Sequence, residues 1–364
     1  MPQINQKQAR NSALELLRIV AMLFIVLSHA CVHSHFHFSP STISLNSLFV
    51  QWGVLGNLGV DIYALISGYF LCKSAKSYRS VIRLLLQVWF YSYTLFLVCK
   101  FVFHYTYSSG DYLQVFFPTV FQEYWFFTAY VVLSLLAPYV NSFLSKADRI
   151  TTRNLIITML ILWVIIPTLT SQNMYAGALA ELLFFYIVGA YFRLYPDYVI
   201  RNKLMLIGIT VFSFVLLFGS TVVINFLAKY KDISQNAGIT FYSRNSLLTV
   251  MCAIGLFALF LNIPTFTNRF INTIAACTFG VYLIHDNPVV RFFVWMRVFR
   301  HAERFDSNFL IAQILASTIL VFSVSVLIEY LRIKITGSYF DRLAAYIEKK
   351  MLSAMHASSN ADRL

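Results

Sequence analysis

Residues 17–30 read LRIVAMLFIVLSHA, an apolar stretch that carries one arginine, Arg18, and one histidine, His29. The stretch is the centre of a longer apolar segment, Leu14 to Val32, which has the length of a membrane-spanning helix. In that helix a separation of eleven residues makes about three turns, so both side chains lie on one face about 16 Å apart. Ionisable groups are costly inside a membrane and usually mark a functional site. Arg18 and His29 are therefore the first candidates for the chemistry of this protein.

The composition of the whole chain is that of a membrane protein. Of its 364 residues, 59% are hydrophobic and 12% are charged, whereas about 25% of an average soluble domain is charged. Apolar runs long enough to cross a bilayer recur along its whole length. We expect ten spans, at Leu14 to Val32, Val50 to Cys72, Val81 to Phe103, Tyr124 to Leu144, Leu155 to Thr170, Ala178 to Leu194, Leu204 to Leu227, Ser246 to Leu261, Phe270 to His285 and Asn308 to Leu331.

The distribution of Lys and Arg predicts the topology. An even number of spans puts both termini on one side, and with that side cytoplasmic the inner segments carry 19 of the 28 basic residues and the outer segments 7. The sequence thus predicts an all-α integral membrane protein with both termini cytoplasmic. Residues 1–335 are expected to form the transmembrane domain and 336–364 a short cytoplasmic tail. Cationic loops facing anionic lipid account for the net charge of +13, so no nucleic-acid partner is expected.

A second informative stretch is GNLGVDIYALISGYF, residues 56–70. Counted from the cytoplasmic ends of the spans, Ser67 lies at the depth of Arg18, and Asp61 is the acidic residue closest in depth to His29. Asp61 is therefore a candidate for orienting or charging the histidine. The alternative is that Asp61 caps the start of a glycine-rich helix.

Three further polar residues, Glu123, Glu181 and His285, fall near predicted outer helix ends at a level that could meet His29. Each could equally be a solvated helix end. His33 follows His29 by one turn, which raises the possibility of a metal site, but no acidic residue lies near them in the sequence, and Cys31 between them is expected to be a packing residue. We therefore expect no metal.

The motifs, taken in order, resemble the bacterial acyltransferase 3 family. They are the Arg-x10-His pattern of the first span, the Ser67-Gly68-Tyr69 element with a basic turn after it, the aromatic stretch EYWFFTAYVVLSLLAPYV (123–140), and GVYLIH (280–285). The resemblance extends from Leu14 to about Leu331. It implies ten core helices, location in the bacterial cytoplasmic membrane, and transfer of an acyl group, usually acetyl from acetyl-CoA, to hydroxyls of surface polysaccharides or lipid-linked sugars.

The resemblance also implies roles for particular residues. His29 takes the place of the catalytic histidine, and Arg18 that of the arginine that engages the donor. Donor binding extends to the residues that match the second motif and its basic turn, which are Ser67, Gly68, Tyr69, Arg79 and Arg83. Trp125 and His285 match late family motifs and are expected on the acceptor side.

Chemistry agrees with these assignments. A histidine titrates near neutral pH, so His29 can take the proton of an attacking hydroxyl; it can also serve as a nucleophile that carries the acyl group. Arg79 and Arg83 could clamp the phosphates of coenzyme A or simply anchor the topology. We therefore predict a membrane O-acetyltransferase that uses acetyl-CoA. The alternatives are a transporter or flippase, in which Arg18, His29 and Asp61 line a pathway, and a catalytically dead scaffold.

Overall fold

The computed structural model describes residues 11–39, 41–73, 78–172, 174, 177–231 and 237–361. All regular secondary structure within these ranges is helical. The α-helices are α1 (Ser12–Val32), α2 (Leu45–Trp52), α3 (Gly56–Leu71), α4 (Arg79–Phe101), α5 (Ser109–Phe116), α6 (Trp125–Lys146), α7 (Arg149–Leu160), α8 (Ile166–Thr170), α9 (Ala178–Leu194), α10 (Lys203–Leu227), α11 (Leu247–Leu261), α12 (Arg269–His285), α13 (Pro288–Phe292) and α14 (Leu310–Ala361). Short π and 3-10 segments are η1 (Ile161–Ile165), η2 (Pro196–Tyr198), η3 (Ala237–Tyr242), η4 (Phe293–Phe299) and η5 (His301–Arg304).

The helices confirm an all-α membrane protein. Within the described residues, eight helical segments are long and apolar enough to cross a membrane. Two of the predicted spans fall outside these eight and correspond to α9 and α12, which have 17 residues each. A helix of that length is at the lower limit of about 17 to 25 residues for a span. Each of the ten predicted spans therefore corresponds to a helix or a helical segment. Helices α9 and α12 are the shortest of these and just reach the length that a span requires.

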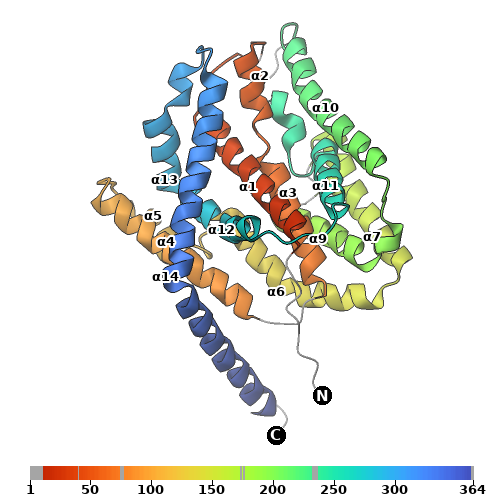
Figure 1. The fold of residues 1–364 in the computed structure, drawn as a ribbon, viewed down its shortest axis with the longest axis vertical. Helices are drawn as coiled ribbons and strands as arrows, with labels where there is room; N and C mark the ends of the chain where they lie inside the picture. The colour runs from red at the N-terminus through yellow and green to blue at the C-terminus, as the bar shows by residue number, and fades with distance from the viewer. Residues whose placement is uncertain are drawn as a thin grey trace.

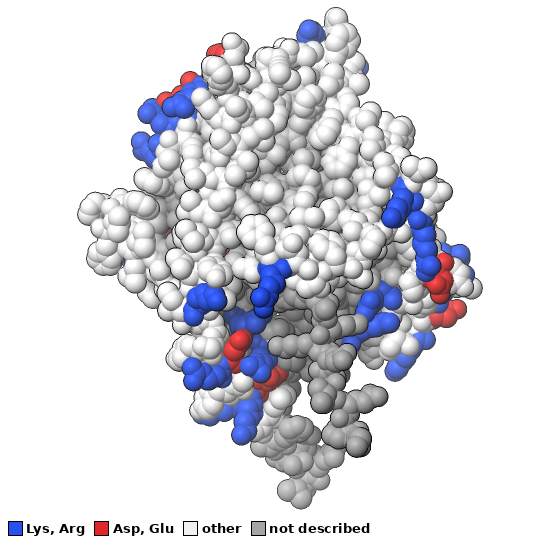
Figure 2. All heavy atoms as spheres, viewed as in Figure 1, with Lys and Arg blue, Asp and Glu red and all other residues white. Residues whose placement is uncertain are grey.

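The helices form one bundle around α1, which lies at its centre (Figure 1). Helices α3, α11, α12 and α14 contact α1 directly. The helix α14 ends on the side of the bundle where α1 begins (Figure 1). Figure 2 shows Lys and Arg gathered mainly toward that side, with the middle of the visible face nearly free of charge. This arrangement matches the predicted topology, in which basic residues concentrate at the cytoplasmic face.

Hydrogen bonds join the starts of α1 and α12 and set how these two helices lie relative to each other. Asn11 caps α1 by accepting a hydrogen bond from the backbone N–H of Ala13, the usual role of a short polar N-cap. The Ser12 hydroxyl donates to Oδ1 of Asn272 at 2.8 Å, and the Ser12 N–H donates to the Phe266 carbonyl. The two helices are thereby joined near their first turns and run side by side, so their last turns also meet.

Glycines allow α3 and α9 to pack closely. A Cβ atom on Gly68 would collide with the carbonyl of Tyr186 in α9, and one on Gly189 would collide with the carbonyl of Leu65 in α3. Small residues at such crossings let helix backbones approach in a membrane. The structure therefore gives Gly68, predicted to bind the donor, a packing role at this helix crossing.

Two helices differ from their predicted extents. The predicted span from Val50 to Cys72 is divided into α2 and α3, with a break at residues 53–55. A Cβ atom at Gly53 would collide with Cys31 of α1, so the break lies where the chain passes close to that helix. At the other end of the chain, α14 continues for 52 residues without interruption at residue 335. The predicted tail is thus a continuation of the last helix.

Candidate active site

The last turns of α1 and α12 bring two histidines together. Nδ1 of His29 lies 3.0 Å from Nε2 of His285, and the ring centroids are 5.0 Å apart. The side chain of His29 is 19% exposed, whereas His285 is 1% exposed. His285 thus lies behind His29 and leaves one edge of the His29 ring accessible. The prediction that His285 could meet His29 agrees with this geometry.

The hydrogen bonds of His285 define the proton positions on both rings. Nδ1 of His285 lies 2.6 Å from the carbonyl oxygen of Val281. A carbonyl only accepts hydrogen bonds, so this Nδ1 carries the proton, and Nε2 of the neutral ring holds a lone pair. That lone pair accepts the hydrogen bond from Nδ1–H of His29. In the neutral ring of His29, Nε2 is therefore the unprotonated nitrogen and is able to accept a proton.

A carboxylate supports the same histidine. Oδ1 of Asp286 lies 3.5 Å from Nδ1 of His29 and 2.9 Å from Nη1 of Arg291. Asp286 directly follows α12, and its side chain is 4% exposed. Once His29 accepts a proton, Asp286 can stabilise the positive charge, while Arg291 balances the carboxylate beforehand.

Asp61 does not hold the position that was predicted for it. The carboxylate beside His29 is Asp286, and neither oxygen of Asp61 has a hydrogen-bond partner among the described residues. The charged groups that act on Asp61 are Arg244 and Glu181. Residue counting estimates depth along a helix but not direction around its axis, which explains the difference. Asp61 lies within α3, five residues after its start, so it is not an N-cap either.

His29 faces a cavity of about 260 Å³, here called the histidine cavity. Its polar lining includes His29, His33, Asn57, Arg244 and Asp286. Trp125, a predicted acceptor residue, also lines it, and the Arg244 guanidinium lies 4.6 Å from its ring centroid. The cavity therefore combines the free nitrogen of a histidine, an aromatic face and a cation.

A second cavity, of about 340 Å³, adjoins the first through Asn57 and Arg244, which line both. We call it the polar cavity because most of its lining residues are Ser, Thr, Asn, Gln, Glu or Arg. Glu181 accepts a hydrogen bond from Nε of Arg244 at 2.6 Å. This ion pair brings Glu181 near the histidine cavity, in agreement with its predicted level.

A third cavity, of about 450 Å³, contains Arg18 and is called the arginine cavity. Its basic lining residues are Arg18, Arg83 and Arg332, and Ser67 lines it as well. Each arginine has a carboxylate within 3.4 Å: Glu15 for Arg18, Asp341 for Arg83 and Glu329 for Arg332. Three residues line both this cavity and the histidine cavity, namely Met22, Phe126 and Tyr282. These three side chains lie between the two spaces.

Two other residues predicted to bind the donor lie outside the arginine cavity. The Tyr69 hydroxyl accepts a hydrogen bond from Arg193, and its ring packs edge-on against Phe257. Tyr69 therefore faces α9 and α11. Arg79 is exposed at the start of α4 and donates to the backbone carbonyl of Asp341 in α14. Its contact joins two helices beside the cavity that Arg83 lines.

Glu123 is half-buried and lines a smaller cavity of about 90 Å³, which His29 does not line. It accepts hydrogen bonds from Ser92 at 2.7 Å and from Asn287 at 3.1 Å. Burial raises the pKa of this carboxyl to about 7, and the Ser92 hydrogen bond opposes the shift. The predicted meeting of Glu123 with His29 is thus indirect, since Asn287 directly follows Asp286 in the chain.

His29, His33 and Asp286 form a group with the character of a metal site. Their potential ligand atoms all lie within 4.8 Å of one another. The sequence showed only the two histidines, because the acidic member comes from a distant segment. A divalent ion bound there would occupy the side chains that surround the free nitrogen of His29.

The sequence prediction missed Asp286, Arg244 and Arg332. Asp286 had the clearest signal, because it directly follows the His285 that was singled out. Arg244 lies in the polar segment YSRNS, residues 242–246, between apolar runs. Arg332 follows its partner Glu329 by three residues and lies directly after the end of a predicted span.

Comparison with known proteins identifies a family. The family described as "Acyltransferase domain" matches residues 11–330, which include every residue of the histidine and polar cavities. No curated protein and no solved structure shows significant similarity to the chain.

Proposed function

The chain belongs to the acyltransferase 3 family, and from this premise we propose that it moves an acetyl group from acetyl-CoA to a hydroxyl of a surface polysaccharide or its lipid-linked precursor. Membership of this family makes it a membrane acyltransferase, which favours acyl transfer over the transporter interpretation. The donor, the acceptor and the location in a bacterial cytoplasmic membrane are parts of the proposal.

One observation carries the proposal. His29 lines a cavity and uses its Nδ1 to bond His285, which leaves Nε2 free, and among the described residues Met22, Phe126 and Tyr282 line both that cavity and the arginine cavity. A base that can reach both a donor and an acceptor is what transfer between the two requires. The His29–His285 hydrogen bond and Asp286 hold the ring in the tautomer that a base needs.

The proposed reaction is a direct transfer. Nε2 of His29 accepts the proton of the acceptor hydroxyl while the hydroxyl oxygen attacks the carbonyl carbon of the thioester. The carbon–sulfur bond then breaks, and the sulfur of coenzyme A takes the proton from His29. The products are an acetyl ester and free coenzyme A. Asp286 stabilises the imidazolium that exists between the two proton transfers.

The arginine cavity suits the donor. Coenzyme A carries phosphates, and arginines bind phosphate oxygens through paired, charge-assisted hydrogen bonds. Arg18 and Arg83 would exchange their carboxylate partners for phosphates. The extended pantetheine arm would then pass Met22, Phe126 and Tyr282 toward His29, along a helix face where Arg18 and His29 are about 16 Å apart.

The polar cavity suits a sugar acceptor. Its hydroxyl and amide side chains offer many hydrogen-bond partners, and a sugar ring presents many hydroxyls. Arg244, which is paired with Glu181, lines both that cavity and the histidine cavity, and its guanidinium lies over the ring of Trp125. A hydroxyl of a sugar bound there would point toward Nε2 of His29. Access from the membrane side would admit a lipid-linked precursor.

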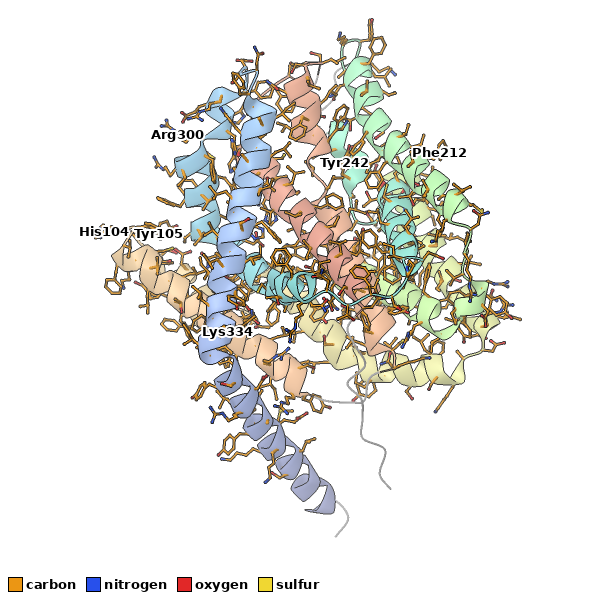
Figure 3. The ribbon with its side chains drawn as sticks, viewed as in Figure 1. His104, Tyr105, Phe212, Tyr242, Arg300 and Lys334 are labelled. Atoms are coloured by element: carbon orange, nitrogen blue, oxygen red, sulfur yellow. The ribbon has the colours of Figure 1, made fainter. Side chains whose placement is uncertain are left out.

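The test combines a purified protein and a strain. Release of coenzyme A from acetyl-CoA is measured with surface polysaccharide of a deletion strain as the acceptor, for the parent protein, His29→Asn and His104→Asn. His104 is a matched control because it lies at the tip of the α4–α5 loop, exposed and away from the bundle centre (Figure 3). We expect loss of a general base to cost about 10² to 10⁴ in rate. Equal rates for all three proteins, or unchanged glycan acetylation in the deletion strain, would contradict the proposal.

A further inference from the structure

Tyr282 occupies the boundary between the arginine cavity and the histidine cavity. It lies in α12 one turn before His285, is 4% exposed, and lines both spaces. Its ring is held edge-on against Phe126 at 5.8 Å, with an interplanar angle of 89°, and lies 5.8 Å from Tyr124. Packing on several sides fixes the direction of the hydroxyl.

The Tyr282 hydroxyl has no hydrogen-bond partner among the described residues. Leaving a buried polar group without a partner is costly, and more so where no water is at hand. The neighbouring Tyr63, which lines the arginine cavity, instead donates its hydroxyl to the carbonyl of Arg18 at 3.1 Å. Tyr282 therefore retains an unused O–H donor at the point where a ligand would pass between the cavities.

The first turn of α6 lies beside Tyr282. The backbone N–H groups of Phe126 and Phe127 belong to that turn, and the ring of Phe126 packs against the ring of Tyr282. Helix α6 has no side-chain cap at its start, so these N–H groups lack intrahelical partners and carry the positive end of the helix dipole. The hydroxyl thus lies in a region of positive potential, next to the histidine cavity that contains the proposed base.

We propose that Tyr282 is a catalytic residue that donates a hydrogen bond to the carbonyl oxygen of the thioester, with the start of α6 supplying additional positive potential. The inference rests on the acyltransferase function proposed above. When the acceptor oxygen bonds to the carbonyl carbon, the electron pair of the C=O bond moves to the carbonyl oxygen. Tyr282 stabilises that negative oxygen until the carbon–sulfur bond breaks and coenzyme A leaves.

In this assignment His29 and Tyr282 act on different atoms of the reaction. His29 acts on the incoming hydroxyl from the histidine cavity, and Tyr282 acts on the carbonyl oxygen at the boundary. A preorganised donor of this kind is most valuable where water is excluded, because it needs no rearrangement as charge develops. Removal of one such donor lowers kcat by about 10² to 10³.

The first test is kinetic. Tyr282→Phe keeps the ring and removes the hydroxyl, so we expect kcat to fall by about 10² to 10³ with the dissociation constant for acetyl-CoA changed less than about threefold. The matched control is Tyr242→Phe (Tyr242 is labelled in Figure 3), since Tyr242 is equally buried and its hydroxyl forms a hydrogen bond with that of Thr221 at 3.2 Å. Tyr242 lines none of the three cavities. Its kcat should stay near that of the parent. A Tyr282→Phe protein with kcat within threefold of the parent would overturn the inference.

The second test does not require turnover. Acetyl-CoA labelled with ¹³C at the carbonyl is bound to the His29→Asn protein, and the carbonyl stretch is measured by difference infrared spectroscopy. We expect a lower frequency than in solution, and a return toward the solution value when Tyr282→Phe is added. An unchanged frequency in the double variant would overturn the inference. A parent protein that releases no coenzyme A would instead contradict the proposed function itself.

Discussion

Replacement of Asp286 by Asn should slow the reaction without preventing donor binding. The carboxylate lies 3.5 Å from Nδ1 of His29, which becomes positively charged when the base takes a proton. At an effective dielectric constant of about 20, two unit charges at that distance attract by about 5 kcal/mol. Arg291 offsets part of the carboxylate charge, so we expect about 3 to 4 kcal/mol to be lost, which is a fall in kcat of about 10² to 10³.

A second variant distinguishes charge stabilisation from simple packing. In Asp286→Asn the guanidinium of Arg291 remains nearby and repels the imidazolium, so the double variant Asp286→Asn/Arg291→Gln should be less impaired than the single one. The control is Asp197→Asn, because that side chain is 84% exposed and paired only with Arg201 in its own segment. Rates are measured with saturating acetyl-CoA. A single variant with kcat within threefold of the parent, or a double variant slower than the single, would show that the electrostatic reasoning is wrong.

Three further predictions concern other parts of the molecule. Arg83→Gln should raise the KM for acetyl-CoA by about two- to tenfold and reduce the salt dependence of donor binding. Arg79→Gln, outside the cavity, should change both quantities less. Binding of acetyl-CoA measured over a salt series tests this, and an Arg79→Gln effect as large as that of Arg83→Gln would contradict it. Because the folded pKa of Glu123, about 7, exceeds the ordinary value of 4.5 for a glutamate, the folded state holds more protons between these values, so stability should fall by up to about 3 kcal/mol as pH rises through this range. Thermal unfolding at pH 5 and pH 8 measures this, and Glu123→Gln should remove the difference. Zn²⁺ should inhibit acetyl transfer reversibly, and His33→Ala should raise the inhibitory Zn²⁺ concentration at least about tenfold. Equal inhibition of the parent and His33→Ala would exclude binding of Zn²⁺ by the group of His29, His33 and Asp286.

The spans could be predicted from the sequence because a bilayer imposes a length that apolar runs must meet. The predicted limits Ala178 to Leu194 are those of α9. The break between α2 and α3 could not be predicted in the same way. It depends on the close approach of Gly53 to Cys31 of another helix, and such an approach is a property of the packed bundle.

The candidate site was predictable to the level of its helices but not of all its contacts. Arg18 and His29 followed from one helix, and their separation needed only the helical rise. The carboxylate beside His29 required knowledge of which faces of different helices meet, and residue counting selected Asp61 where the structure has Asp286. Tyr69 shows the same limit. The sequence motif singled out this residue, but the packing of α3 against α9 determines where its side chain points.

The most direct test of sided transfer through His29 uses oriented proteoliposomes. Radiolabelled acetyl-CoA is supplied only to the face where α1 begins and α14 ends, and polysaccharide from the deletion strain, freed of existing esters by mild alkali, is enclosed on the opposite face. We predict that labelled ester accumulates on the enclosed polysaccharide, that His29→Asn abolishes it, and that His104→Asn leaves it unchanged. Ester formed only on polysaccharide at the face that received acetyl-CoA, or formed equally by His29→Asn, would contradict the proposal.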